Sequence, residues 1–154
     1  MVDISMIAAI SDNFVIGNKG DIPWYIPEDF KLFKFYTQNK PIIMGKKTWD
    51  SLPKKPLPNR ENIVISKKNV EDNCTTFDNI EDAINYCSDY DEVFIIGGQT
   101  IYEQFLPKAD YLYISHVKGE YEGDTFFPKF NKDNYEIIEE IEYEDFTFRK
   151  YKRK

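Results

Sequence analysis

The sequence alternates short apolar segments with helix-forming segments over most of its length and then ends in strand-forming segments alone. Strands are expected at residues 3–10, 41–45, 62–66, 74–77, 92–96, 111–117, 135–143 and 146–151. Helices are expected to start near Pro27, Lys46, Asn79 and Gln99. Alternation of this kind is typical of a mainly parallel sheet, because parallel strands need a crossover that is usually a helix.

The closing strands have no helix between them, so we expect them to pair antiparallel at one edge of the sheet. The sequence therefore predicts an α/β fold with a central sheet of about eight strands and helices on both faces. A chain of 154 residues fits a single domain, spanning residues 1–154.

The composition argues against several classes of protein. A net charge of −7 disfavours nucleic-acid binding, and no apolar run is long enough to span a membrane. The chain has two cysteines, Cys74 and Cys87, and one histidine, His116, which is too few soft ligands for a structural zinc site. We expect His116 to be structural rather than catalytic. The expected protein is a cytoplasmic monomer that binds no metal, no nucleic acid and no membrane.

Positive charge is concentrated in one region of this acidic chain. Residues 46–68 contain seven lysines and arginines and only two acids, Asp50 and Glu61. A local positive region on an acidic protein favours a small polyanionic ligand, because a long polyanion would be repelled elsewhere. Ordinary solvated lysines explain the same charges equally well.

Asp29 stands at the expected start of a helix, inside a strongly apolar segment. Pro27 suits the first helical turn, where its missing N–H would have no partner, and the helix dipole favours an acid there. Phe30 and Phe33 would lie on the same side of the helix as Asp29. A carboxylate among aromatic rings costs free energy unless a donor satisfies it. Asp29 is therefore either a helix-capping acid or a ligand-binding group.

Three strand ends carry groups that bind phosphate. Gly97-Gly98 lies between a strand and a helix, where glycines let an anion approach the backbone and the helix start attracts it. Gly45-Lys46-Lys47-Thr48 repeats this arrangement, and Ser66-Lys67 ends a third strand. The carboxyl ends of parallel strands form the usual ligand-binding edge of an α/β sheet. These groups favour NADP over NAD, although a tight turn alone would explain the Gly-Gly pair.

Arg60 follows the rigid sequence Pro56-Leu57-Pro58. Its guanidinium can hold a carboxylate through two parallel hydrogen bonds. An ordinary surface arginine is the alternative. Together, these features describe a site for a nucleotide, for a flat ring beside Asp29, and for a ligand carboxylate on Arg60.

The order and spacing of short motifs resemble the dihydrofolate reductase family from about Ile4 to Pro128. The matching pieces are Ile-Ala-Ala (7–9), Val-Ile-Gly (15–17), Pro-Trp (23–24), Pro-x-Asp-x-x-x-Phe (27–33), Ile-Met-Gly-Lys-Lys-Thr-Trp (43–49), Pro-Leu-Pro-x-Arg (56–60), Asn-Ile-Val-Ile-Ser (62–66), Ile-Gly-Gly (96–98), Tyr-Glu-Gln-Phe-Leu-Pro (102–107) and Glu-Gly-Asp-Thr-Phe-Phe-Pro (122–128). The resemblance implies the family's fold and an NADPH-dependent reduction of 7,8-dihydrofolate to tetrahydrofolate. It also implies that antifolate inhibitors bind.

By that resemblance, Asp29 binds the pterin 2-amino group and N3–H, and Arg60 holds the glutamate carboxylate of the substrate. Residues 13–24 form a mobile lid over the nicotinamide. The residues implied at the reaction centre are Asp29 and two lid residues, Ile22 and Trp24. The further substrate-binding residues implied are Ile7, Phe30, Phe33, Lys34, Leu52, Leu57, Ile96 and Ser115. The cofactor-binding residues implied are Ala9, Ile16, Gly17, Gly45, Lys46, Lys47, Thr48, Ser66, Lys67, Gly97, Gly98, Gln99, Thr100, Ile101 and Tyr102.

Two other functions remain open from the sequence. A reductase of the same fold that acts on a pyrimidine would share the nucleotide site, although Asp29 after Pro23-Trp24 argues against it. A non-catalytic folate- or nucleotide-binding module would share both sites. Turnover of dihydrofolate separates these alternatives.

Overall fold

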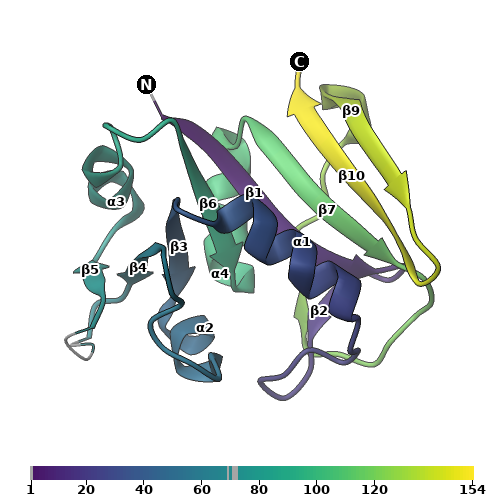
Figure 1. Cartoon of the computed structure of the whole chain (residues 1–154), viewed down its shortest axis with the longest axis horizontal. Coiled ribbons are helices and arrows are strands. Elements are labelled where there is room, and N and C mark those ends of the chain that lie inside the picture. The colour runs from purple at the N-terminus through teal and green to yellow at the C-terminus, as the bar shows by residue number, and fades with distance from the viewer. Residues whose placement is uncertain (1, 69, 71–72) are drawn as a thin grey trace.

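The computed structural model describes residues 2–68, 70 and 73–154 and shows a twisted eight-stranded sheet (Figure 1). The strand order is β5-β4-β3-β6-β1-β7-β10-β9. Its strands are β1 (Asp3–Ser11), β3 (Pro41–Gly45), β4 (Glu61–Ile65), β5 (Thr75–Phe77), β6 (Glu92–Gly97), β7 (Tyr111–Val117), β9 (Tyr135–Glu142) and β10 (Phe146–Arg153). The first six strands of this order pair in parallel, and β10 pairs antiparallel with both β7 and β9. The predicted parallel sheet with an antiparallel edge is confirmed.

Helices cover both faces of the sheet, as the alternation predicted. They are α1 (Pro27–Thr37), α2 (Lys46–Ser51), α3 (Ile80–Tyr86) and α4 (Gln99–Phe105), with short 3₁₀ helices η1 (Leu106–Lys108) and η2 (Lys132–Asn134). In Figure 1, α1 crosses in front of the sheet and α4 lies behind it. No helix among the described residues has the length and apolar character needed to cross a membrane.

Local chemistry explains where the helices begin. Pro27 occupies the first turn of α1, and Glu28 and Asp29 follow it at the positive end of the helix dipole. Asn79 caps α3, because its side-chain oxygen accepts the backbone N–H of Asp82 at 2.9 Å. The sequence therefore predicted these two helix starts for the physical reasons that the structure shows.

Alternating side chains of the central strands build two separate cores. Met6 and Ile10 of β1 pack with α3 and α4 on one face, whereas Ile7 packs with α1 and α2 on the other. This follows from the two-residue period of a strand, which sends neighbouring side chains to opposite faces. The central strands are thus buried on both sides, whereas β9 at the edge of the sheet is largely exposed. The carboxyl ends of the central strands remain available for the site.

A second, two-stranded sheet was not predicted. It pairs β2 (Val15–Gly17) with β8 (Thr125–Phe126) in antiparallel register. Strands this short carry no readable periodicity, and they are held by contacts between segments far apart in sequence. The pair fastens the start of the segment 13–24 to the segment before β9.

Candidate active site

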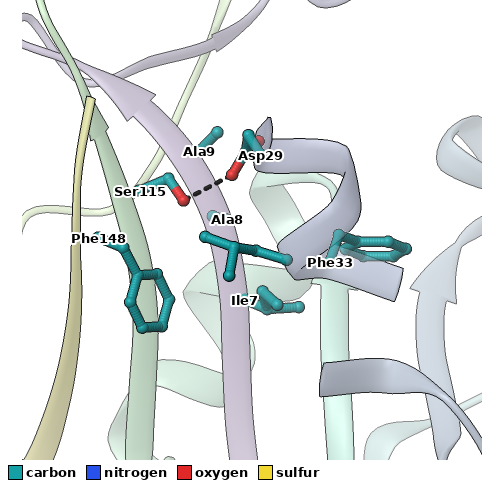
Figure 2. A pocket seen from close by; sticks show the side chains of 8 residues that line it. Ile7, Ala8, Ala9, Asp29, Phe33, Ser115 and Phe148 are labelled. Atoms are coloured by element: carbon teal, nitrogen blue, oxygen red, sulfur yellow. Dashed lines mark hydrogen bonds between the residues drawn. The ribbon is translucent and has the colours of Figure 1, made fainter. Parts of the chain in front are cut away.

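The first turn of α1 places the Asp29 carboxylate against strand β7. The backbone N–H of Asp29 donates to the carbonyl oxygen of Ile26 at 3.0 Å, which fixes Asp29 at the start of the helix. The hydroxyl of Ser115, on β7, donates to Oδ1 of Asp29 at 2.5 Å (Figure 2). These two residues are far apart in sequence, so their contact depends on α1 crossing the sheet at this point.

A pocket lies beside this carboxylate (Figure 2). Ala9, Ser115 and Phe148 are direct neighbours across β1, β7 and β10, and they line it from the sheet. The complete lining is Ile7, Ala8, Ala9, Asp29, Leu32, Phe33, Ser115 and Phe148. The pocket is apolar apart from one hydroxyl and one carboxylate, so it suits a flat ring with hydrogen-bond donors on one edge.

The surroundings of Asp29 act on its charge in two opposite ways. Burial raises the pKa of Asp29 above its ordinary value, because a charged carboxylate is poorly solvated there. The hydrogen bond from Ser115 lowers the pKa, since it stabilises the charged form. Burial is the larger effect. A partly desolvated carboxylate gains more from a cationic or donating ligand than an exposed one would.

Tyr102 lies beneath this pocket rather than in it. Only 4% of Tyr102 is exposed, and its hydroxyl donates to the carbonyl oxygen of Ile7 at 2.7 Å. Burial and the nearby charge of Asp29 both raise the pKa of the Tyr102 hydroxyl, which keeps it protonated. The structure thus gives Tyr102 a supporting position next to the floor of the site, and its predicted contact with the cofactor remains a prediction.

The other residues predicted to bind substrate surround the pocket at different depths. Leu52, Leu57 and Ile96 are half-buried and pack in the same core cluster as Phe33. Phe30 is 44% exposed, and its ring packs against Tyr25 with centroids 5.7 Å apart. Lys34, in the last turn of α1, is exposed. These four hydrophobic residues and Lys34 lie outside the pocket lining.

Arg60 is held in a fixed position at the carboxyl end of α1. Its Nε donates to the carbonyl oxygen of Pro58 at 2.9 Å, and its Nη1 donates to Thr37 Oγ1 at 3.1 Å. The guanidinium lies 6.0 Å from the ring centroid of Phe33. Within the described part of the chain, no acidic side chain pairs with Arg60 within 4.0 Å. The guanidinium is therefore positioned without being neutralised, as a carboxylate-binding arginine needs to be.

The two glycine-containing strand ends pack directly against each other. A Cβ on Gly45 would lie 3.1 Å from Ile101 Cγ1, and a Cβ on Gly98 would lie 3.4 Å from Thr48 Oγ1. Gly97 has φ of +121°, a conformation that favours glycine, and its peptide bond to Gly98 is cis. A side chain at Gly45 or Gly97 would crowd Ile101 or Tyr102, so the glycines let the starts of α2 and α4 pack closely together. The backbone N–H groups of two adjacent helix starts suit the pyrophosphate of a dinucleotide.

The polar residues predicted beside this junction are only partly free to meet a phosphate. Lys46 donates to Asp50 Oδ2 at 2.9 Å within α2, so its charge is already paired. Lys47, Lys67 and Thr100 are exposed, and the Ser66 hydroxyl accepts the backbone N–H of Lys68 at 3.1 Å. The pairing of Lys46 was readable from its four-residue spacing to Asp50, but it was not predicted.

The segment predicted to be a lid is fastened at several points. The side chain of Asn13 donates to the carbonyl oxygen of Tyr121 at 2.9 Å, and the ring of Trp24 lies edge-on to Tyr121 at 5.0 Å. Ile16 and Gly17 belong to β2, and Gln99 Oε1 accepts the backbone N–H of Phe126 in β8 at 2.9 Å. Ile22 is 46% exposed. Movement of this segment remains a prediction.

Comparison with known proteins identifies the family. The protein-family model for dihydrofolate reductase matches residues 3–153. The dihydrofolate reductase of Neisseria gonorrhoeae is 45% identical over 146 residues, which cover 92% of this chain and 89% of that protein. The dihydrofolate reductase of Bacillus subtilis is 39% identical, covering 88% of this chain and 81% of that protein. The chain belongs to the dihydrofolate reductase family.

A solved structure agrees with this assignment. Dihydrofolate reductase from Enterococcus faecalis, complexed with NADP(H) and RAB-propyl, superposes with a TM-score of 0.88 at 28% identity. The superposition covers 98% of this chain and 96% of that one. The chain is thus an NADPH-dependent oxidoreductase that reduces dihydrofolate to tetrahydrofolate. Neither the pyrimidine reductase nor the non-catalytic module finds support among these relatives.

Three residues of the dihydrofolate reductase pocket were missed from the sequence. Leu32 lies one turn along α1 from Asp29, so its helical spacing was a usable signal. Ala8 lies between two predicted residues of β1. Phe148 reaches the pocket from β10, through a cross-strand register that no local pattern revealed.

Proposed function

We propose that Asp29 binds the 2-amino group and the N3–H of the pterin ring during the reduction of dihydrofolate. The observation that carries this role is a partly buried carboxylate, held by Ser115, at one end of an apolar pocket. A carboxylate can accept two parallel hydrogen bonds from such an amidine edge. The apolar walls of the pocket then cover the two faces of the ring.

The charge of Asp29 also has a role in the chemistry. NADPH, when bound, supplies a hydride to pterin C6, and pterin N5 gains a proton. Protonation makes the ring cationic, and a nearby fixed anion in a poorly solvated pocket stabilises that charge. Because Asp29 binds the far edge of the ring, the proton reaches N5 from solvent. Ser115 keeps the carboxylate ionised and oriented.

Arg60 would bind the glutamate carboxylate of dihydrofolate. Support comes from its hydrogen bonds to the Pro58 carbonyl oxygen and the Thr37 hydroxyl, which orient the guanidinium before a ligand binds. Preorganisation of this kind lowers the entropy cost of binding. The half-buried residues Leu52, Leu57 and Phe33 lie in the same core cluster and would contact the part of the substrate between the pterin and Arg60.

The junction of β3–α2 with β6–α4 would bind the NADPH pyrophosphate. The close packing of the two helix starts at Gly45 and Gly98 supports this role, and Ala9 in the pocket lining would face the nicotinamide. Lys67 is the more suitable partner for the 2′-phosphate, because it is exposed whereas Lys46 is already paired with Asp50. The lid residues Ile22 and Trp24 would close over the nicotinamide and exclude water.

We further propose that the enzyme works as a monomer of one domain and that antifolate inhibitors occupy the pterin pocket. Asp29, Ser115 and the other pocket residues come from helix α1 and the central sheet of a single domain, which supports the first point. The carboxylate that would bind the pterin amidine suits any inhibitor with the same donor edge. The cytoplasmic location remains a prediction from the sequence.

The decisive experiment measures the fall in NADPH absorbance when 7,8-dihydrofolate is added. We expect oxidation that depends on dihydrofolate, and a loss of about a hundredfold or more in kcat/KM for Asp29→Asn near neutral pH. Glu28→Gln is the matched control, because Glu28 is an exposed acid in the same helical turn. It should retain the wild-type rate.

Two outcomes would contradict this proposal. An Asp29→Asn variant as active as the Glu28→Gln variant would remove Asp29 from its role. Oxidation of NADPH by an aminopyrimidine substrate but not by dihydrofolate would instead assign the pocket to the pyrimidine reductase class.

A further inference from the structure

A second pocket lies on the opposite face of the sheet from Asp29. Its side chains come from the end of β1 and the turn after it, the end of β7 and the residue after it, the start of β10, and helix η2. Ile10, His116 and Thr147 are direct neighbours across β1, β7 and β10, and all three line this pocket. None of the proposed substrate- or cofactor-binding residues lines it.

Basic side chains dominate the charge of this second pocket. Lys118, Lys132 and Arg149 line it, and Asp12 is its one acid. Asp12 Oδ2 accepts the backbone N–H of Gly119 at 2.9 Å, which satisfies part of its hydrogen-bonding capacity. Three cations in one pocket are unusual for a chain with a net charge of −7, because acids outnumber bases on the rest of its surface.

The three cations differ in how far they are already paired. Arg149 Nε donates to Glu140 Oε2 at 2.6 Å, and Lys118 Nζ donates to the carbonyl oxygen of Glu144 at 2.8 Å. Lys132 has no acidic side chain within 4.0 Å among the residues that the structure describes. Lys118 and Lys132 thus keep donors and charge for a ligand, whereas Arg149 is engaged by Glu140 and also by a hydrogen bond with Tyr151.

His116 adds a neutral hydrogen-bonding group to the same wall. Its Nε2 lies 2.9 Å from the hydroxyl of Tyr151. Burial lowers the pKa of His116 to about 4, and the positive charges of Arg149 and Lys132 act in the same direction. Asp12 and Glu140 oppose that effect without overcoming it. Because burial is the largest cause of this shift, His116 is a neutral hydrogen-bonding group at neutral pH.

We propose that this pocket, lined by Lys118, Lys132 and Arg149, binds a small oxyanion of the phosphate class. Lysine ammonium groups and a guanidinium supply donors to several oxygens of one ligand, which is the arrangement that phosphate recognition uses. The Thr147 side chain adds a hydroxyl at the same wall. Free phosphate and the phosphate of a small monoester share this chemistry.

The position of the pocket connects it to the active site through the sheet. His116 follows Ser115 directly on β7, so the two side chains point to opposite faces. The row Ile10–His116–Thr147 is therefore the neighbour of the row Ala9–Ser115–Phe148 that lines the pterin pocket. An oxyanion in the second pocket would lie directly across the sheet from the Ser115–Asp29 hydrogen bond.

His116 gives this site a specific spectroscopic probe, because it is the only histidine in the chain. The experiment follows its ring signals by NMR while inorganic phosphate or glycerol phosphate is added at constant ionic strength. NADP⁺ is present to fill the dinucleotide site, and sodium chloride serves as the reference salt. We expect saturable shifts of the His116 signals with at least one phosphate probe and none with chloride.

Two variants distinguish a defined phosphate site from nonspecific attraction of anions to surface lysines. Lys132→Gln should weaken phosphate binding by up to about fivefold, as expected for the loss of one exposed ion pair. Lys129→Gln is the matched control, since Lys129 is an exposed lysine nearby that does not line the pocket. Shifts that never saturate, or that weaken equally in the two variants, would overturn the proposal. Saturation by the monoester alone would support it and identify an ester as the source of the phosphate.

Discussion

Replacing Ser115 with alanine tests how the site controls the charge of Asp29. The Ser115 hydroxyl donates to Asp29 Oδ1 at 2.5 Å and lowers the pKa of that carboxyl. A hydrogen bond to a charged group contributes about 1.5–3 kcal/mol. In the variant, donors from solvent or substrate replace part of this hydrogen-bond free energy, so we use about 1.5 kcal/mol, the lower end of the range. That free energy corresponds to about one pH unit in the ionisation of Asp29.

The expected result is a shift in the pH dependence of kcat/KM for dihydrofolate. Without Ser115, the charged form of Asp29 is less stable, so its pKa rises and the carboxylate is lost at a higher pH. The acid limb of the profile should move toward neutral by about one pH unit. The rate well above that limb should change little, because Asp29 is ionised there in both proteins.

Ser5→Ala is the matched control for this experiment. Ser5 is a buried serine of β1 whose hydroxyl donates to Glu92 Oε2 at 2.6 Å, away from the pterin pocket. It should lower the melting temperature without moving the pH profile. A Ser115→Ala profile that superposes on the wild-type profile would refute the assigned role of Ser115. So would an equal shift in the Ser5→Ala protein.

Three further changes test other parts of the account. Asp29→Asn should raise the Tm of the ligand-free protein at pH 7, because burial raises the Asp29 pKa and so makes the charged form destabilising. The gain in Tm should vanish below about pH 4, where Asp29 is protonated in both the folded and the unfolded chain. An unchanged Tm at pH 7 would contradict this prediction. Arg60→Lys should raise KM for dihydrofolate about tenfold or more, since a lysine cannot form the paired hydrogen bonds, and should spare a pterin that lacks the glutamate. Lys67→Ala should lower kcat/KM with NADPH about two- to fivefold and leave kcat/KM with NADH unaffected, whereas equal losses would place 2′-phosphate recognition elsewhere.

Local sequence signals predicted most of the central sheet and the position of Asp29. Pro27 with the acids after it fixed the start of α1, and the buried strands were long enough to show continuous apolar character. The glycines at the ends of β3 and β6 predicted a shared junction, and the structure packs Gly45 against Ile101 there.

What the sequence could not predict depends on contacts between distant segments. The β2–β8 pair joins segments too short for a periodic pattern, and its register is set by the surrounding fold. Phe148 enters the pocket only because β10 pairs antiparallel with β7 in one particular register. The second pocket has the same origin, since Lys132 and Arg149 meet His116 through tertiary structure alone.

The most direct test of the central claim is a crystal structure of the protein with folate and NADP⁺. We expect the 2-amino group and N3 of the pterin to lie within hydrogen-bonding distance of the Asp29 carboxylate. The folate glutamate should then meet Arg60, and the Ser115 hydroxyl should still donate to Asp29. A pterin bound in the same pocket with its amino group turned away from Asp29 would contradict the account.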